Sequence, residues 1–379
     1  MSAPLGDLRV IDASSVLAGP ACARYLADFG ADVIKVERPD GGDTLRGLGW
    51  RDPRDGVGLF WKLNARNKRT IALDLKDTAD HATFLSLCRD AHVLIENFRP
   101  GTLERLGLAP ELLLEENPGL VIVRVTGFGQ DGPYRNRPGF ASIAEAMSGF
   151  AAIAGEPDGA PLLPPIALTD EVTGLVAAYA AMVALHSGVG QVVDVNLLES
   201  LFQLMGPLIS AYRMFGYEQP RLGSGIPYTV PRGTYQCSDG VWVAVSTSAE
   251  SVAARVMALL GVGGDPRFAT FADRVTHREE LDGLVADWIA ARPSAEVLET
   301  FTKAEAAIAP VMTMADISSD PHYAARGSIV ELDGVPMQGL IARLSATPGA
   351  LRWAGRGLDA DGDEIRANGW GLDAKRPPA

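Results

Sequence analysis

Two neighbouring carboxylates stand at the start of a long run of small apolar residues. Asp170 and Glu171 follow Thr169, and the alanine-rich stretch 169–185 has helical spacing. A side chain at this place could cap the helix by accepting hydrogen bonds from its first free N–H groups. The positive end of the same helix would also keep Asp170 ionised and aimed, as a covalent nucleophile requires. Capping and nucleophilic catalysis are compatible, so the residues alone leave both interpretations open.

Four basic side chains follow runs that are typical of strands. They are Arg38, Lys76, Arg99 and Arg105. In a parallel sheet the carboxyl ends of the strands share one edge, so these cations could converge on a phosphate-bearing ligand. For any single one of them, a solvated surface charge is the alternative.

Other familiar catalytic and binding motifs are incomplete. The turn Val16–Pro20 lies about 20 residues before Glu37, as in dinucleotide-binding proteins. The GxGxxG glycines are absent, however, and Arg38 follows the acidic residue, which disfavours NAD. The histidines show no metal-ligand spacing and no GxSxG motif signals a Ser-His-Asp triad, so no metal is expected. The segment Gly223–Gly225 could offer N–H groups to an anion or act as a flexible hinge.

The elements that must position these residues alternate in type along the first third of the chain. Five short β-branched runs alternate with helical stretches, and their nearly continuous apolar character is expected of strands covered on both faces by helices. This order predicts a doubly wound α/β layer, followed by a second helical stretch at 196–212. Between 234 and 310 a hairpin and several helices predict a smaller α+β unit. The five predicted strands are 8–13, 31–37, 69–75, 92–98 and 120–125.

The composition of the chain limits the ligands that it can bind and the cellular compartment in which we expect it. With 34 Lys and Arg against 47 Asp and Glu, the formal net charge of −13 argues against general binding to nucleic acid or anionic lipid. Cys22, Cys88 and Cys237 are isolated, so we expect no disulfide framework and a reducing, cytoplasmic location. The chain starts without a signal-like segment, and no stretch approaches the ~18 apolar residues of a membrane helix. Neither export nor membrane insertion is therefore expected.

Several motifs follow one another along most of the chain. They are Val16–Pro20, Leu26–Glu37, Asn67–Arg69, Glu96–Gly101, Gly127–Gly129, Arg137–Gly139, Gly190–Glu199 and Asp320–Arg326. In this order and spacing they are specific, and the chain resembles the class III CoA-transferases. Relatives of that family include formyl-CoA transferase, carnitine CoA-transferases and α-methylacyl-CoA racemase.

The resemblance implies a fold and an assembly. The doubly wound part would be a Rossmann-like large domain, into which a smaller α+β domain is inserted, and the C-terminal segment would return to the large domain. The resulting boundaries are 1–220 for the large domain, 221–310 for the small domain with its linkers, and 311–379 for the linker and return. Because the family's subunits are interlocked, an obligatory homodimer is expected.

The resemblance also implies roles for individual residues. Asp170 falls at the family's catalytic aspartate, which attacks an acyl-CoA thioester and forms first a mixed anhydride and then an aspartyl-CoA thioester. Coenzyme A would enter as a substrate, and no metal would be needed. The implied CoA contacts are Val16, Arg38, Leu73, Lys76, Asn97, Phe98 and Arg105. The implied substrate pocket comprises Phe60, Phe140, Glu145, Gly223 and Gly225, with Val16 also at the acyl end.

Three departures from the family's pattern bear on the reaction. Phe140 stands where the racemases of the superfamily have a histidine, and phenylalanine cannot transfer a proton. Ala141 replaces a common acidic residue, and Glu145 replaces a common glutamine. Glu145 is either a helix-surface charge or a group that tunes substrate choice or the ionisation of Asp170. CoA transfer is the leading prediction and an acyl-CoA racemase or isomerase is the alternative, while the donor and acceptor acids stay open.

Overall fold

The computed structural model describes residues 3–371, which divide into two compact units. The large unit comprises the described parts of 1–148, 164–206 and 322–379, and the small unit comprises 149–163 and 207–321. The small domain predicted at 221–310 lies inside the small unit. That unit also takes in the flanking segments and the separate piece at 149–163.

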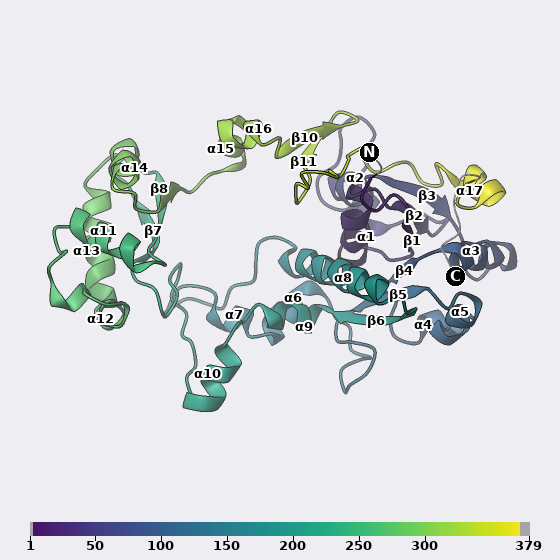
Figure 1. The fold of residues 1–379 in the computed structure, drawn as a ribbon, viewed down its shortest axis with the longest axis horizontal. Coiled ribbons are helices and arrows are strands. Elements are labelled where there is room, and N and C mark those ends of the chain that lie inside the picture. Colours follow the sequence, from purple (N-terminus) through teal and green to yellow (C-terminus); the bar gives the residue numbers. More distant parts are fainter. Residues whose placement is uncertain (1–2, 372–379) are drawn as a thin grey trace. The chain divides into compact units, whose positions relative to one another are not determined.

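A six-stranded parallel sheet forms the centre of the large unit (Figure 1). Its strand order is β3-β2-β1-β4-β5-β6, so the direction of winding reverses between β1 and β4. The predicted doubly wound α/β layer is therefore confirmed. The strands are β1 (Arg9–Asp12), β2 (Asp32–Glu37), β3 (Lys68–Ala72), β4 (Val93–Glu96), β5 (Val121–Thr126) and β6 (Gln191–Asn196).

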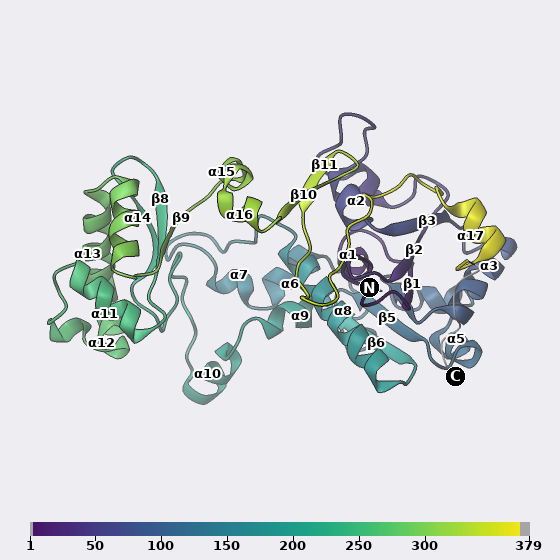
Figure 2. The same ribbon diagram turned by 45° about the horizontal axis from the view of Figure 1, so that its top comes forward.

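Helices cover both faces of this sheet (Figure 2). Successive strand residues point to opposite faces, so Val10 packs with α1 (Ala18–Asp28) and α8 (Leu168–Ser187), while Ile11 packs with α3 (Thr78–Asp90). Burial of both faces explains why the strands are continuous apolar runs. The large unit also holds the antiparallel pair β10 (Ile329–Leu332) and β11 (Val335–Gln338) and a 3-10 turn, Thr44–Gly47. Its helices are α1 (Ala18–Asp28), α2 (Leu59–Asn64), α3 (Thr78–Asp90), α4 (Thr102–Arg105), α5 (Pro110–Glu116), α6 (Ala141–Met147), α8 (Leu168–Ser187), α9 (Leu197–Gln203) and α17 (Gly362–Asn368).

The region after α8 differs from its prediction. The sequence predicts no strand there and one helical stretch over 196–212, whereas the chain forms β6 and then two helices, α9 and α10 (Leu208–Phe215). β6 lies at the sheet edge, and its first four residues alternate half-buried and exposed, so it lacks the apolar run of the inner strands. The helical stretch breaks near Gly206, whose φ of 57° lies in the left-handed region.

The small unit is built on a three-stranded antiparallel sheet of order β7-β8-β9. The predicted hairpin is present as β7 (Arg232–Gln236) and β8 (Trp242–Ser246), and β9 (Ile308–Pro310) adds a strand that was not predicted. Its core joins Val243 and Val245 to Ile289 and Phe301. A 3-10 turn, Pro266–Phe268, also belongs to this unit, and α16 (Pro321–Ala325) begins at its last residue. Its helices are α7 (Phe150–Ile153), α10, α11 (Glu250–Leu259), α12 (Phe271–Thr276), α13 (Arg278–Ala290), α14 (Ser294–Lys303) and α15 (Met314–Ser319).

α8 contradicts the expectation that no stretch approaches a membrane span. Among the described residues it has the length and apolar composition to cross a membrane, with a mean hydropathy of 1.4. Core helices pass the same test, and α8 buries Thr173, Ala177 and Ala181 against α1 and the sheet. Packing within the chain therefore accounts for the apolar residues on this side of α8, and 39% of its apolar window is buried.

Gly174 allows α8 to lie directly against α1. A Cβ at this position would come 2.8 Å from the Cβ of Ala21 and 3.0 Å from the carbonyl oxygen of Ala18. We expect Gly174→Val to force the helices apart and to lower the free energy of unfolding by about 2–3 kcal/mol. Chemical denaturation would measure this, with Gly283→Val as the control, because a Cβ at that helical glycine meets no atom within 4 Å. Equal losses in both variants would contradict the close contact.

Candidate active site

A cavity of about 520 Å³ opens at the carboxyl ends of β1, β2, β3 and β4 in the large unit. This is the switch point of the sheet, where doubly wound proteins bind ligands. The cavity is lined by 18 residues, and four of the seven predicted CoA contacts are among them. Those four are Arg38, Leu73, Lys76 and Phe98.

The cavity holds two cations that are free to meet an anion. Arg38 and Lys76 are exposed, and neither has an ion-pair partner within the described residues. Arg38 donates one weak hydrogen bond, of 3.4 Å, to the carbonyl oxygen of Gly42. Lys35 also lines the cavity but is buried and paired with Asp12 and Asp43. Arg38 and Lys76 are therefore the groups that can bind phosphate oxygens.

The other three predicted CoA contacts lie beside the cavity. Asn97 forms two hydrogen bonds to the backbone of Ser15, accepting from its N–H at 2.8 Å and donating to its carbonyl at 2.7 Å. Arg105 is exposed and donates to the hydroxyl of Thr102, which lines the cavity. Val16, next to Ser15, is about one-third exposed. Because Asn97 fixes the backbone of Ser15, which lines the cavity, it shapes the cavity wall.

Asp170 is the third residue of α8 and does not cap it. The N-cap position is held by Ala167 without a side-chain hydrogen bond, so the expectation that Thr169 or Asp170 caps the helix is wrong. Among the described residues, none forms a hydrogen bond or ion pair with the carboxylate of Asp170. Burial, and then the nearby Glu145 and Glu171, raise the pKa of Asp170 to about 6. At pH 7 about nine in ten of these carboxylates stay ionised.

Glu145 is a buried neighbour of Asp170. Only 3% of the residue is exposed, so the interpretation of Glu145 as a helix-surface charge is wrong. Its Oε1 accepts a hydrogen bond of 2.8 Å from the hydroxyl of Thr169, the residue that precedes Asp170. Thr169 does not cap the helix because it is the second residue of α8 and not its N-cap. The structure thus brings a second carboxylate close to the first turn of α8.

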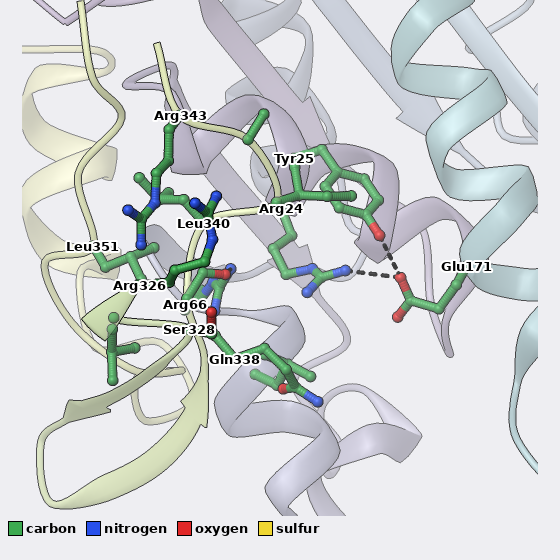
Figure 3. Close-up of a pocket in the computed structure, with 16 residues that line it drawn as sticks. Arg24, Tyr25, Arg66, Glu171, Arg326, Ser328, Gln338, Leu340, Arg343 and Leu351 are labelled. Atoms are coloured by element: carbon green, nitrogen blue, oxygen red, sulfur yellow. Dashed lines mark hydrogen bonds and ion pairs between the residues drawn. The ribbon is translucent and has the colours of Figure 1, made fainter. Parts of the chain in front are cut away.

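Glu171 is held by α1 on the other side of this turn. Its Oε2 accepts hydrogen bonds from Arg24 at 2.8 Å and from the hydroxyl of Tyr25 at 2.6 Å (Figure 3). The three residues form one wall of a second cavity of about 740 Å³, whose other wall includes Arg326 and Arg343. With Glu171 paired, Asp170 is the carboxylate of the two that can attack an electrophile.

The predicted substrate-pocket residues fall in both units. Phe140 directly precedes α6 and is 67% exposed, and Phe60 in α2 stacks on Trp50 with ring centroids 6.3 Å apart. Gly223 and Gly225 belong to the small unit. Their N–H groups donate to the carbonyl oxygens of Gly155 and Leu222, so they are not offered to an anion.

Sequence analysis missed the charged groups beneath the cavity. Asp12, Lys35 and Lys68 lie on three adjacent strands and are all buried, and Asp12 and Lys35 belong to runs that are otherwise mostly apolar. A charge inside a strand covered on both faces was the available signal, because such a charge must find a partner. For metal binding, no group of three or more His, Cys, Asp or Glu side chains gathers within residues 3–371.

Comparisons with known proteins agree over nearly the full length. The family model described as CoA-transferase family III matches residues 5–361. The chain is 40% identical to a succinyl-CoA–D-citramalate CoA-transferase of Chloroflexus aurantiacus, covering 97% of this chain and 94% of that one. It is 39% identical to the beta subunit of a succinyl-CoA–L-malate CoA-transferase of the same organism, covering 96% and 93%. A crystal structure of a CAIB/BAIF family protein from Brucella suis superposes with a TM-score of 0.85 at 32% identity, covering 97% and 99%.

Proposed function

Because the chain belongs to CoA-transferase family III and is a CoA-transferase, we propose that Asp170 carries first the acyl group and then coenzyme A during the transfer. The observation that carries this proposal is the unpaired, partly buried carboxylate in the first turn of α8. Its raised pKa makes it a more basic and therefore a better nucleophile than an ordinary aspartate, while leaving it mostly ionised at pH 7.

The first half of the reaction loads the enzyme. An oxygen of Asp170 attacks the thioester carbonyl, the C–S bond breaks, and the products are a mixed anhydride and the CoA thiolate. The thiolate then attacks the aspartyl carbonyl carbon, and the donor acid leaves as a carboxylate. An aspartyl-CoA thioester remains, and no net proton is taken up or released.

The second half repeats these steps in reverse. The acceptor carboxylate attacks the aspartyl thioester and expels the CoA thiolate, which then attacks the acceptor's acyl carbon. Asp170 leaves as a free carboxylate. Because one thioester replaces another, no ATP or metal is required, but water must be kept from the anhydride.

We propose that the cavity at the sheet edge binds the CoA moiety. Arg38 and Lys76 would meet its phosphates, and Leu73 and Phe98 offer apolar contacts to its nucleotide. Arg105 would extend the contacts. Phe60, Phe140 and Val16 would line the acyl end.

We propose that the donor acyl group and the acceptor acid are both derived from short dicarboxylic acids. Relatives at 34–40% identity are named for succinyl-CoA with D-citramalate or L-malate, and for succinate with glutarate. Succinyl-CoA is accordingly our proposed donor, with a dicarboxylate acceptor.

Isotope exchange tests the function against the racemase alternative. Carbon-labelled free succinate is incubated with unlabelled succinyl-CoA in D₂O, and the CoA esters are read by mass spectrometry. We expect the carbon label to enter the CoA ester while the α-carbon gains no deuterium, since Phe140 offers no proton. Deuterium without carbon label would favour the racemase or isomerase.

Glu145→Gln should shift the pH dependence of this transfer. The amide keeps an acceptor for the Thr169 hydroxyl but removes a negative charge, so the pKa of Asp170 should fall. We expect the acid limb of kcat/KM, near pH 6 in the wild type, to move down by about 0.5–1 unit. Profiles from about pH 4.5 to about pH 8 would measure this, with Glu199→Gln as the control. An unmoved limb would contradict electrostatic coupling between the two carboxylates.

A homodimer and a cytoplasmic location complete the proposal. α8 exposes an apolar face that includes Leu175, Tyr179 and Val183, of which Tyr179 is 72% exposed. Such a face is typical of a surface covered by another copy. Light scattering should therefore give about twice the chain mass of 40.1 kDa. The free, buried cysteines are compatible with a reducing compartment.

A further inference from the structure

The turn that joins β1 to α1 has a strained backbone at Val16. Its φ is 66°, in the left-handed region that β-branched residues avoid. Val16 is nevertheless about one-third exposed, so packing alone does not hold it. It follows Ser15, which lines the CoA cavity. Strained backbone persists only where surrounding groups fix it, and it gathers at functional sites.

Side chains from three other segments hold three successive residues of this turn. Asp12, at the end of β1, accepts from the N–H of Ser14 at 3.1 Å. Asn97, after β4, bonds both the N–H and the carbonyl of Ser15. Asp43, after β2, accepts from the N–H of Val16 at 3.2 Å. Asp43 is thus the group that contacts the strained residue itself.

Asp43 is fixed in turn by a buried set of charges. Its side chain is 1% exposed, ion-pairs with Lys35 at 3.1 Å and accepts from the N–H of Leu45 at 2.9 Å. Its own N–H donates to Glu37 at 2.9 Å. Lys35 also donates to the carbonyl of Ser14, so the same ammonium group holds both Asp43 and the turn.

Two further contacts make the set rigid. Asp12 lies opposite Lys35 in the parallel register of β1 and β2, and it ion-pairs with Lys68 of β3 at 2.8 Å. Buried charges that satisfy one another in this way have few alternative arrangements. The position of the turn is therefore tied to three strands of the sheet.

We propose that Asp43 is a positioning residue that holds Val16 in its left-handed conformation and so sets the wall between the CoA cavity and the reacting thioester. Asp43 lines the cavity, but its side chain is 1% exposed and accepts from the N–H groups of Val16 and Leu45, so we assign it a role through the backbone of Val16. This assignment rests on the proposed function for its kinetic consequence. Its structural consequence is that the turn loosens when Asp43 is removed, and this consequence does not depend on the proposed function.

A double-mutant cycle tests the assignment. Asp43→Ala should lower kcat by about 10- to 100-fold while KM for the acyl-CoA changes by less than about 3-fold, because misplacement of the thioester affects the chemical step. Glycine adopts positive φ without strain. In a Val16→Gly background, Asp43→Ala should therefore cost less than about 3-fold in kcat. Equal costs in both backgrounds would overturn the proposal.

Amide hydrogen exchange gives a readout that does not depend on catalysis. Peptides covering 13–18 should exchange faster in Asp43→Ala than in the wild type. Asp28→Asn is the matched control, because Asp28 is an equally buried carboxylate paired with Arg66 outside the turn. If Asp43→Ala does not fold, Asp43→Asn replaces it; the amide keeps an acceptor but loses the ion pair to Lys35 that fixes the side chain, so a smaller rise in exchange over 13–18 is expected. Exchange no faster than in the Asp28 control would overturn the proposal even if transfer by Asp170 is confirmed.

Discussion

Asp170→Asn should abolish CoA transfer and make the protein more stable at neutral pH. The amide cannot attack the thioester, so turnover should fall by at least about 10⁴-fold, the range seen when a covalent nucleophile is removed. Stability should rise because the wild type keeps a partly buried negative charge beside Glu145 and Glu171.

The pH dependence of this stability gain has a definite sign. The pKa of Asp170 is about 6 in the folded protein, above its ordinary value of 3.8. Between these values the folded state binds more protons than the unfolded state, so the carboxylate destabilises the fold progressively as pH rises from about 4 to about 6. Discounted for partial solvent exposure, the full penalty above pH 6 is about 1–2 kcal/mol. The amide avoids it.

Thermal unfolding and steady-state kinetics check both parts. We expect the Tm of Asp170→Asn to exceed that of the wild type by roughly 1–3 °C at pH 7 and the difference to vanish near pH 4. Glu171→Gln is the matched control, because Glu171 is paired with Arg24 and Tyr25. It should lose stability and keep transfer within about 10-fold of the wild type. Substantial turnover by Asp170→Asn would exclude the covalent mechanism.

The CoA cavity could be predicted because its parts are local to strand ends. Arg38 follows the inner strand β2 and Lys76 follows β3 at one edge of the sheet, and because all the strands are parallel their carboxyl ends lie on the same side. The edge strand β6 escaped prediction because its first four residues alternate half-buried and exposed. A pattern rule built on full burial does not detect such a strand.

The surroundings of Asp170 depend on contacts that local patterns do not contain. Thr169 is a good cap by residue type, but α8 begins one residue before it. Its hydroxyl donates to Glu145, 24 residues earlier in the chain. Glu145 lies in the seven-residue helix α6, which is too short for a periodic pattern to show a buried face. The burial of Glu145, and hence the raised pKa of Asp170, follows from tertiary packing.

The ion set beneath the cavity shows the same limit in the strands. Asp12 and Lys35 stand in different strands 23 positions apart, and only the β1–β2 register places them opposite each other. The sequence shows the type of each residue, whereas the identity of its partner depends on the register of the sheet. Resemblance to a family supplies roles for cavity residues, but it did not point to this supporting layer.

Removing both free cations of the cavity should weaken acyl-CoA binding without stopping the chemistry. In Arg38→Ala/Lys76→Ala, two charge-assisted contacts to phosphate are lost, each worth about 1.5–3 kcal/mol. We expect KM for the acyl-CoA to rise by about 100-fold or more, with kcat at saturation within about 3-fold of the wild type, because contacts far from the thioester bind ground and transition states alike. Stability should hardly change, since both side chains are exposed and unpaired.

Salt dependence separates this role from a general loss of charge. Wild-type KM should rise with ionic strength as phosphate contacts are screened, and the double variant should respond less. Arg89→Ala is the control, because Arg89 is an exposed arginine of α3 that pairs with Glu116 and lies outside the cavity lining. An unchanged KM in the double variant would place the CoA phosphates elsewhere. Loss of kcat with unchanged KM would instead mean that these cations act on the reacting thioester, a role that we assign to Asp170.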